Sequence, residues 1–152
     1  MKLNLPEYDF TLKRENNKTL IFDKLRNKFV TLTPEEEVRQ RFVATLITYK
    51  GYPAGRIGNE ISLTLNNTKR RCDTVVYNKF GAPCVIIEYK APNVEITQDV
   101  FDQITRYNSV LKVNYIIVSN GIRSFCCKYD YTHNSYSFLR DIPSYNELDG
   151  CE

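Results

Sequence analysis

The stretch that decides the fold is Cys84–Pro92, CVIIEYKAP, in which an apolar run ends in a glutamate and a lysine before a proline stops it. Side chains alternate between the two faces of a β-strand, so Ile86, Glu88 and Lys90 share one face. Two opposite charges therefore end one face of a strand that is otherwise built to be buried. Either a metal ion and a substrate neutralise these charges, or they form a solvated ion pair.

The residues before this strand predict its partner. Residues 72–78, CDTVVYN, form a second strand, and the short connection KFGAP at 79–83 carries a glycine and a proline. The two strands are therefore expected to form an antiparallel hairpin that places Asp73 beside Glu88 and Lys90. Farther upstream, residues 60–67 alternate between apolar and polar side chains, which predicts a half-buried strand.

Capping signals predict two helices. Thr33 as N-cap, Pro34 at the first position and Glu36 as a capping-box residue start one helix, which Gly51 ends. Thr97 is the expected N-cap of a second helix over residues 98–111 with an apolar stripe. Residues 113–119 then read as a buried strand, and residues 124–130 and 135–141 as a terminal hairpin.

This order of elements predicts an α+β fold, an α/β sandwich with a mixed central sheet flanked by helices. The 152 residues fit one domain over positions 1–152. Residues 1–28 are expected to form a peripheral N-terminal segment of hairpin or loop, and residues 141–152 a loose C-terminal tail.

Composition excludes several classes of protein. The net charge of +3 is too small to indicate a nucleic-acid partner, and it does not argue against one. Five cysteines without a CxxC pair and a single histidine argue against a zinc cluster, and we expect reduced thiols and a cytoplasmic location. The sequence contains no apolar run of about 18 residues for a membrane helix and no G-x-x-x-x-G-K-[ST] motif for an ATP site.

The charges of the predicted hairpin suit metal-dependent hydrolysis of a phosphodiester. Such a reaction needs oxygen ligands for Mg²⁺ or Mn²⁺ and a cation near the attacking water. Asp73 and Glu88 would share the ion, and the backbone carbonyl of Tyr89 is a candidate third ligand. Lys90 would orient the water or stabilise the developing charge.

Asp73, fourteen intervening residues and Glu88-Tyr89-Lys90 resemble the PD-(D/E)xK nuclease motif, with Cys72 in place of the proline that names it. Four segments extend the likeness over residues 32–121: LTPEEEVRQRF, GYPAGRIGNEI, RRCDTVVYNKFGAPCVIIEYKAP and DQITRYN. Together they resemble the N-terminal nuclease domain of type I restriction enzyme R subunits. The resemblance implies a restriction-endonuclease-like fold and a Mg²⁺-dependent DNA endonuclease of restriction or defence, with motor or specificity subunits as partners in trans.

The resemblance also implies further site residues. Gln103 and Tyr107 match a QxxxY pattern and share one face of the second helix, although an ordinary amphipathic helix would have the same spacing. An acid on the first helix is a common extra metal ligand in such nucleases, and Glu37 is the best match, with Glu60 on the first strand as the other candidate. Glu37 could instead simply complement the helix dipole.

Other functions stay open at this point. The basic run of Lys69, Arg70 and Arg71 could contact DNA phosphates or could be a solvated turn. The domain could be a catalytically silent DNA-binding or scaffold module of a restriction complex, or a nuclease for branched or damaged DNA. The three convergent charges at positions 73, 88 and 90 favour an enzyme, because packing alone gives a scaffold no reason to keep them.

Overall fold

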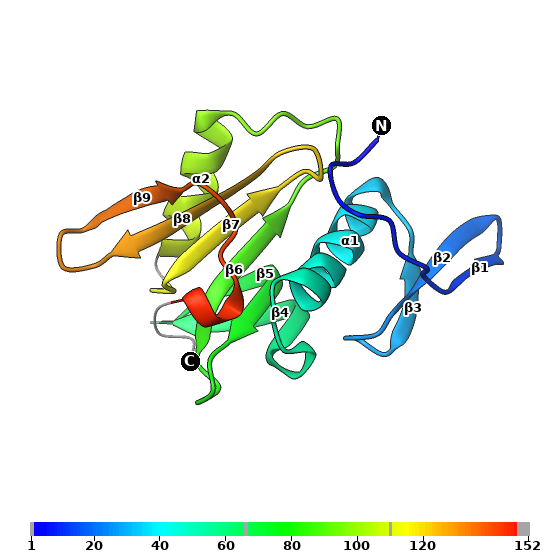
Figure 1. Ribbon diagram of the computed structural model, residues 1–152, viewed down its shortest axis with the longest axis horizontal. Coiled ribbons are helices and arrows are strands. Elements are labelled where there is room, and N and C mark those ends of the chain that lie inside the picture. Colours follow the sequence, from blue (N-terminus) through cyan, green and yellow to red (C-terminus); the bar gives the residue numbers. More distant parts are fainter. Residues whose placement is uncertain (1, 66, 110, 149–152) are drawn as a thin grey trace.

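The computed structural model describes residues 2–65, 67–109 and 111–148, with the backbone alone for residues 65 and 107–109 (Figure 1). Its strands are β1 (Leu12–Glu15), β2 (Lys18–Asp23), β3 (Lys28–Thr31), β4 (Ile57–Leu65), β5 (Thr68–Tyr77), β6 (Pro83–Tyr89), β7 (Tyr115–Ser119), β8 (Ser124–Asp130) and β9 (Ser135–Leu139). Its helices are α1 (Pro34–Tyr49) and α2 (Gln98–Ser109), with short 3₁₀ turns at Ala54–Arg56 and Tyr145–Glu147.

The central sheet is mixed, as predicted. Its six strands follow the order β4-β5-β6-β7-β8-β9. β6 and β7 pair in parallel, whereas the other neighbours pair antiparallel. Parallel neighbours need a crossover connection, and α2 lies within it. The predicted hairpin of β5 and β6 is confirmed, and so is the terminal hairpin of β8 and β9.

The two helices cover opposite faces of this sheet. One buried cluster joins Val38 and Leu46 of α1 to Val85 and Ile87 of β6. The other joins Ile104 and its neighbours on α2 to the alternate strand residues, among them Ile86 and Ile116. Alternation along β6 therefore builds two cores, and the result is a three-layer α/β/α sandwich.

The N-terminal strands form a separate sheet of order β1-β2-β3, which Figure 1 shows beyond α1 and away from the central sheet. Part of this segment is buried, including Leu3, Ile21 and Asp23. At the other end, Tyr145 and Leu148 pack into the core on the α1 side. The described parts of both end segments thus contribute more packing than a peripheral segment and a loose tail would, because each carries apolar side chains that the core accepts. Residues 149–152 of the expected tail lie outside the described residues.

Cys72, Cys126 and Cys127 are free and buried, and burial raises the pKa of each thiol to about 12. Cys84 is disulfide-bonded, so the expectation of reduced thiols does not hold at this position. In the part of the chain that the structure describes, no helix is both long and apolar enough to cross a membrane.

Helix α1 begins at Pro34, as predicted, and Thr33 is its N-cap, with its hydroxyl accepting a hydrogen bond from the Glu36 amide at 3.0 Å. The second half of the expected capping box is absent. The carboxylate of Glu36 binds Arg26, Arg39 and Gln40 instead. The network of buried cations therefore outcompetes the local cap for this side chain.

We predict that Thr33→Ala destabilises the domain by about 1 kcal/mol, because the Glu36 amide loses its acceptor. Urea unfolding monitored by circular dichroism measures this loss. Thr33→Ser keeps a capping hydroxyl and is expected to retain nearly all of the wild-type stability. Equal stability of Thr33→Ala and wild type would contradict the assigned cap.

Candidate active site

The candidate site lies where β5 and β6 separate. Their ladder ends at the pair Thr74–Ile87. Asp73, one residue before Thr74, and Glu88, one residue after Ile87, lie directly beyond this last pair. The Asp73 carboxylate accepts a hydrogen bond from the Tyr89 amide through Oδ2, at 2.9 Å. The hairpin thus brings Asp73 to the Glu88–Lys90 end of β6, as the sequence predicted.

Glu88 is 7% exposed and forms an ion pair with Arg70, whose Nη2 lies 3.0 Å from Oε1. This pair answers the question that the charged strand end poses, because a buried carboxylate needs a partner. Glu88 is balanced by Arg70 of the neighbouring strand rather than by Lys90. A metal ion at Glu88 would therefore share this carboxylate with Arg70 or displace the guanidinium from it.

Lys90 follows the last residue of β6, and its amide donates to the Ser119 carbonyl at 2.9 Å. Its ammonium forms no ion pair with any carboxylate among the residues that the structure describes. Its positive charge works against the net rise in the pKa of Glu35. Lys90 is thus a half-buried cation close enough to act on the Glu35 carboxylate.

Glu35 is a site residue that the sequence reasoning missed. Its pKa is raised by desolvation and by repulsion from Asp73, with a further contribution from Glu60, and these causes outweigh the attraction of Lys90 and Arg39. These mutual influences place the exposed Glu35 carboxylate, in the first turn of α1, within electrostatic range of Asp73. Glu35 is therefore a candidate third carboxylate beside the site.

The structure does not bring Glu37 to this site. Its carboxylate pairs with Arg41 at 3.0 Å, and Arg41 also donates to the carbonyls of Leu5 and Pro6. Glu37 thus faces the N-terminal segment. Two residues along an α-helix correspond to a rotation of about 200°, so Glu35 and Glu37 point in nearly opposite directions.

Glu60 lies beside the site, but both of its oxygens are engaged. Oε1 is 2.9 Å from Arg39 and Oε2 is 2.7 Å from Arg71. Burial alone would raise the pKa of Glu60. The hydrogen bonds from Arg71 and Arg39 lower it by more than burial raises it, so the net shift is downward. Its φ of +57° is unusual for a residue other than glycine.

The basic run that was expected before the strand belongs to β5 itself, and its side chains alternate. Arg70 reaches Glu88 on one side, whereas Arg71 reaches Glu60 on the other. Lys69 is exposed. Two of the three proposed phosphate ligands are therefore paired with carboxylates of the candidate site.

The structure places Gln103 on the exposed side of α2, which packs on the sheet through Phe101 and Ile104. No contact joins Gln103 to Asp73 or Glu88 among the described residues. The side chain of Tyr107 lies outside the described part of the chain, so the proposed pair stays a prediction.

Within residues 2–65, 67–109 and 111–148, no three His, Cys, Asp or Glu side chains converge tightly enough to hold a metal ion by themselves. The donors at hand are carboxylate oxygens of Asp73, Glu88 and Glu35. Mg²⁺ is usually bound through one or two carboxylates together with water and substrate oxygens, rather than in an all-protein cage. The donor set fits such an ion in its chemistry.

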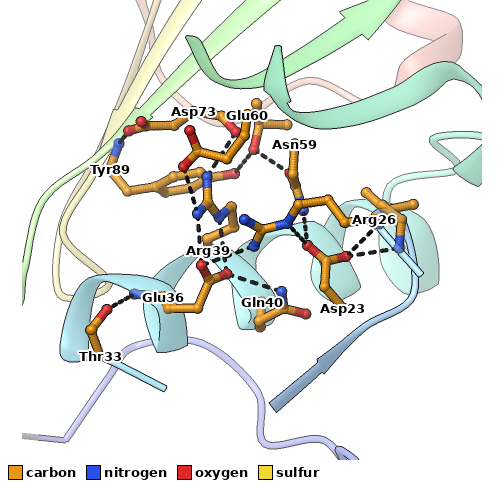
Figure 2. A network of polar contacts seen from close by, with 12 residues as sticks. Asp23, Arg26, Thr33, Glu36, Arg39, Gln40, Asn59, Glu60, Asp73 and Tyr89 are labelled. Carbon is orange, nitrogen blue, oxygen red and sulfur yellow. Dashed lines mark hydrogen bonds and ion pairs between the residues drawn. The ribbon is translucent and has the colours of Figure 1, made fainter. Parts of the chain in front are cut away.

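Behind these carboxylates lies a buried polar network (Figure 2). Glu36 accepts hydrogen bonds from Arg39 through both oxygens, at 2.7 and 3.0 Å, and from Arg26 at 2.9 Å. Burial alone would raise the pKa of Glu36, but the hydrogen bonds from Arg39, Gln40 and Arg26 lower it below 4.5. The buried carboxylate is therefore held in its ionised form.

A mixed sheet between two helices, with carboxylates gathered where two central strands separate, is consistent with a restriction-endonuclease-like domain. The sequence pattern of the family described as type I restriction enzyme R protein N terminus matches residues 34–143, and the chain belongs to this family.

A solved structure supports the fold. It is a fragment of a chain assigned as an HsdR subunit of a type I restriction enzyme from Vibrio vulnificus YJ016, with a TM-score of 0.55 and 19% sequence identity. The match covers 77% of the present chain and 24% of the solved one. No curated protein matches the chain. The predicted fold and family are thereby confirmed.

We predict that Glu36→Gln destabilises the domain at pH 7 by roughly 3 to 5 kcal/mol, because Arg39 and Arg26 both lose a buried carboxylate partner. Since the folded pKa of Glu36 is lowered, its contribution is complete above the unfolded value of 4.5 and is lost as the pH falls through the folded pKa. Urea unfolding at pH 7 and pH 3 measures the difference between variant and wild type, which should shrink at the lower pH.

Glu35→Gln is the matched control, because folding raises the pKa of Glu35, whereas it lowers that of Glu36. The stability that Glu35 contributes is present below 4.5 and is lost as the pH rises through its folded pKa. At pH 7 this variant should be at least as stable as wild type. A Glu36→Gln deficit that is the same at both pH values would show that its ionisation is not the cause.

Proposed function

We propose that this domain is a Mg²⁺-dependent DNA endonuclease module of a restriction system, a hydrolase of phosphodiester bonds. The observation that carries the proposal is the hydrogen bond from the Tyr89 amide to the Asp73 carboxylate, which fixes Asp73 at the strand end that bears Glu88 and Lys90. Membership of the R protein N-terminal family supports a restriction role.

Each residue of the proposed site has a distinct task. Asp73 and Glu88 would hold Mg²⁺ or Mn²⁺, with the Tyr89 carbonyl as a further oxygen donor. Glu35 takes the place that the sequence had suggested for Glu37. The bound ion would polarise the phosphate and activate water. Lys90, which forms no ion pair with the side chains that the structure describes, would orient that water or stabilise charge on the phosphorane-like transition state.

The arginines of β5 would respond to DNA. Arg71 has a side chain that is 69% exposed, and Lys69 is exposed as well, so phosphate groups can reach both. DNA phosphates would also attract Arg70 and thereby release Glu88 for the ion. From α2, Gln103 would contact the substrate together with Tyr107. Motor and specificity subunits in trans are the proposed protein partners.

One observation favours a second function. Glu88 is paired with Arg70, and no metal-binding group is ready among the described residues. A catalytically silent DNA-binding or scaffold module would keep this arrangement permanently. A nuclease for branched or damaged DNA would use the same residues as the first proposal and would differ in its substrate alone.

We predict that Asp73→Ala and Glu88→Ala each abolish Mn²⁺ binding and DNA cleavage together, because an oxygen ligand is lost from a hard-cation site. Lys90→Ala should keep metal binding within about threefold and lose cleavage by a factor of at least about 100, since its ammonium acts on the reaction rather than on the ion. Calorimetric titration and a nicking assay on supercoiled DNA measure the two properties. A wild-type domain that neither binds Mn²⁺ in the presence of DNA nor nicks it would favour the scaffold.

The acids of α1 provide a matched pair of variants. Glu35→Ala should weaken Mn²⁺ binding and slow nicking by about tenfold, as expected for a supporting carboxylate of a metal site. Glu37→Ala removes a carboxylate that pairs with Arg41 away from the site and should leave both properties unchanged. The same titration and nicking assay compare them. If the two variants behaved alike, the assignment of Glu35 to the site would be wrong.

A further inference from the structure

We infer that Arg39 is a positioning residue for the candidate site, because its guanidinium holds the main chain of Asp73 and thereby sets where the Asp73 carboxylate stands. The inference concerns the geometry of Asp73 in the folded domain. Its consequence for metal binding rests on the proposed function.

The first argument is the gap in the sheet at Asp73. The ladder between β4 and β5 pairs Asn59 with Thr74 and Ile61 with Cys72, but the pair between them, Glu60 with Asp73, is missing from the register. On the other side, the ladder with β6 stops at Thr74. Asp73 therefore stands outside the pairing on both of its sides, at the point where the left-handed backbone of Glu60 interrupts β4.

Arg39 fills this gap. Its Nη1 donates to the main-chain carbonyl of Asp73 at 2.9 Å, in place of a neighbouring strand. The same guanidinium binds both oxygens of Glu36 and, through Nη2, reaches Glu60 at 2.9 Å. Because a guanidinium is planar, fixing it on Glu36 fixes the direction of its bond to Asp73. A lysine could hold the charge but not this geometry.

The second argument is that the network closes on Tyr89, the residue that the Asp73 carboxylate binds. The hydroxyl of Tyr89 donates to Thr74 at 3.0 Å, and the Thr74 hydroxyl donates to Asn59 at 2.7 Å. Asn59 in turn donates to Asp23 at 3.0 Å, and Asp23 binds Arg26. Tyr89 is thus held at both its amide and its hydroxyl.

Arg26 completes the ring, because it donates to Glu36, the anchor of Arg39. Figure 2 shows these side chains converging between α1 and the strands that bear Asp73 and Tyr89. One network therefore holds both the carbonyl of Asp73 and the hydroxyl of Tyr89. The hydrogen bond from the Tyr89 amide to the Asp73 carboxylate links these two residues directly. Loosening Arg39 should loosen that bond first.

Arg41 offers a matched control on the same helix. It is 9% exposed against 7% for Arg39. Like Arg39, it binds one carboxylate on its own helix and two further oxygen-bearing groups outside the helix. Its partners, however, are the carbonyls of Leu5 and Pro6 in the N-terminal segment. Arg39→Lys and Arg41→Lys thus each replace a buried guanidinium by an ammonium, and only the first substitution removes a hydrogen bond to Asp73.

The test is amide hydrogen exchange measured by NMR on the metal-free full chain. In Arg39→Lys we expect the Tyr89 amide to exchange at least about tenfold faster relative to the amide of Val118, a buried neighbour in β7 that does not depend on Asp73. In Arg41→Lys this ratio should equal that of wild type. An unchanged ratio in Arg39→Lys would overturn the inference.

A milder variant covers the case in which Arg39→Lys does not fold. Glu60→Gln removes one partner of Arg39 at a position that is partly exposed, and it leaves the pair with Glu36 intact. It should raise the relative exchange rate of the Tyr89 amide in the same direction. No change in that rate, with Arg39→Lys unfolded, would also overturn the inference.

Mn²⁺ titration separates this inference from the proposed function. If the site binds metal, Arg39→Lys should weaken binding by about tenfold to a hundredfold, the usual effect of losing a residue that orients a ligand, and Arg41→Lys should not. Equal affinity of Arg39→Lys and wild type would overturn the inference. A wild type that binds no Mn²⁺ overturns the proposed function instead, and amide exchange then decides the role of Arg39.

Discussion

The structure depends on the burial of one arginine charge. A buried guanidinium is tolerated only where carboxylates and carbonyls surround it, because an uncompensated charge in a protein interior is very unfavourable. Arg39 meets this requirement with groups from three different elements: Glu36 of α1, Glu60 of β4 and the carbonyl of Asp73 in β5. If these elements took up other relative positions, the buried guanidinium of Arg39 would lose hydrogen-bond and ion-pair partners. The helix, the edge of the central sheet and the candidate site are therefore set by a single electrostatic condition.

The same condition explains why the small N-terminal sheet belongs to the domain. Asp23 at the end of β2 accepts from Asn59 of β4, and Arg26 in the following turn donates to Glu36. The first sheet is thus attached to the helix and to the central sheet through charged groups as well as through buried apolar side chains such as Ile21. Hydrogen bonds of this kind are directional, so they fix the orientation of the sheet more closely than apolar packing would.

Much of the fold could be predicted from the sequence because its signals are local. The apolar runs in residues 72–78 and 84–90 and the short connection between them, with its glycine and proline, identified the central hairpin, and Thr33-Pro34 identified the start of α1. The three N-terminal strands were harder to predict, since their residues are polar and alternate weakly. They form because neighbouring strands satisfy the backbone and because Ile21 and Asp23 find partners elsewhere in the fold.

The candidate site was predictable in part. Asp73, Glu88 and Lys90 follow from the hairpin register, which is a consequence of local pattern. Which acid of α1 turns towards them depends on how the helix packs, and the sequence pointed to Glu37, whereas Glu35 lies in the field of Asp73. The pairing of Arg70 with Glu88 and the left-handed backbone of Glu60 are likewise products of long-range contacts, and no short motif announces them.

The pairing of Glu88 with Arg70, and of Glu60 with two arginines, has a consequence for assembly. In domains whose ligand groups have no other partners, the metal itself supplies the free energy of folding, and chelators unfold them. Here internal cations already neutralise two of the clustered acids. The domain can therefore reach its native structure before any divalent ion is present. Under the proposed function, a cell short of such ions would hold it folded rather than unfolded and exposed to proteases.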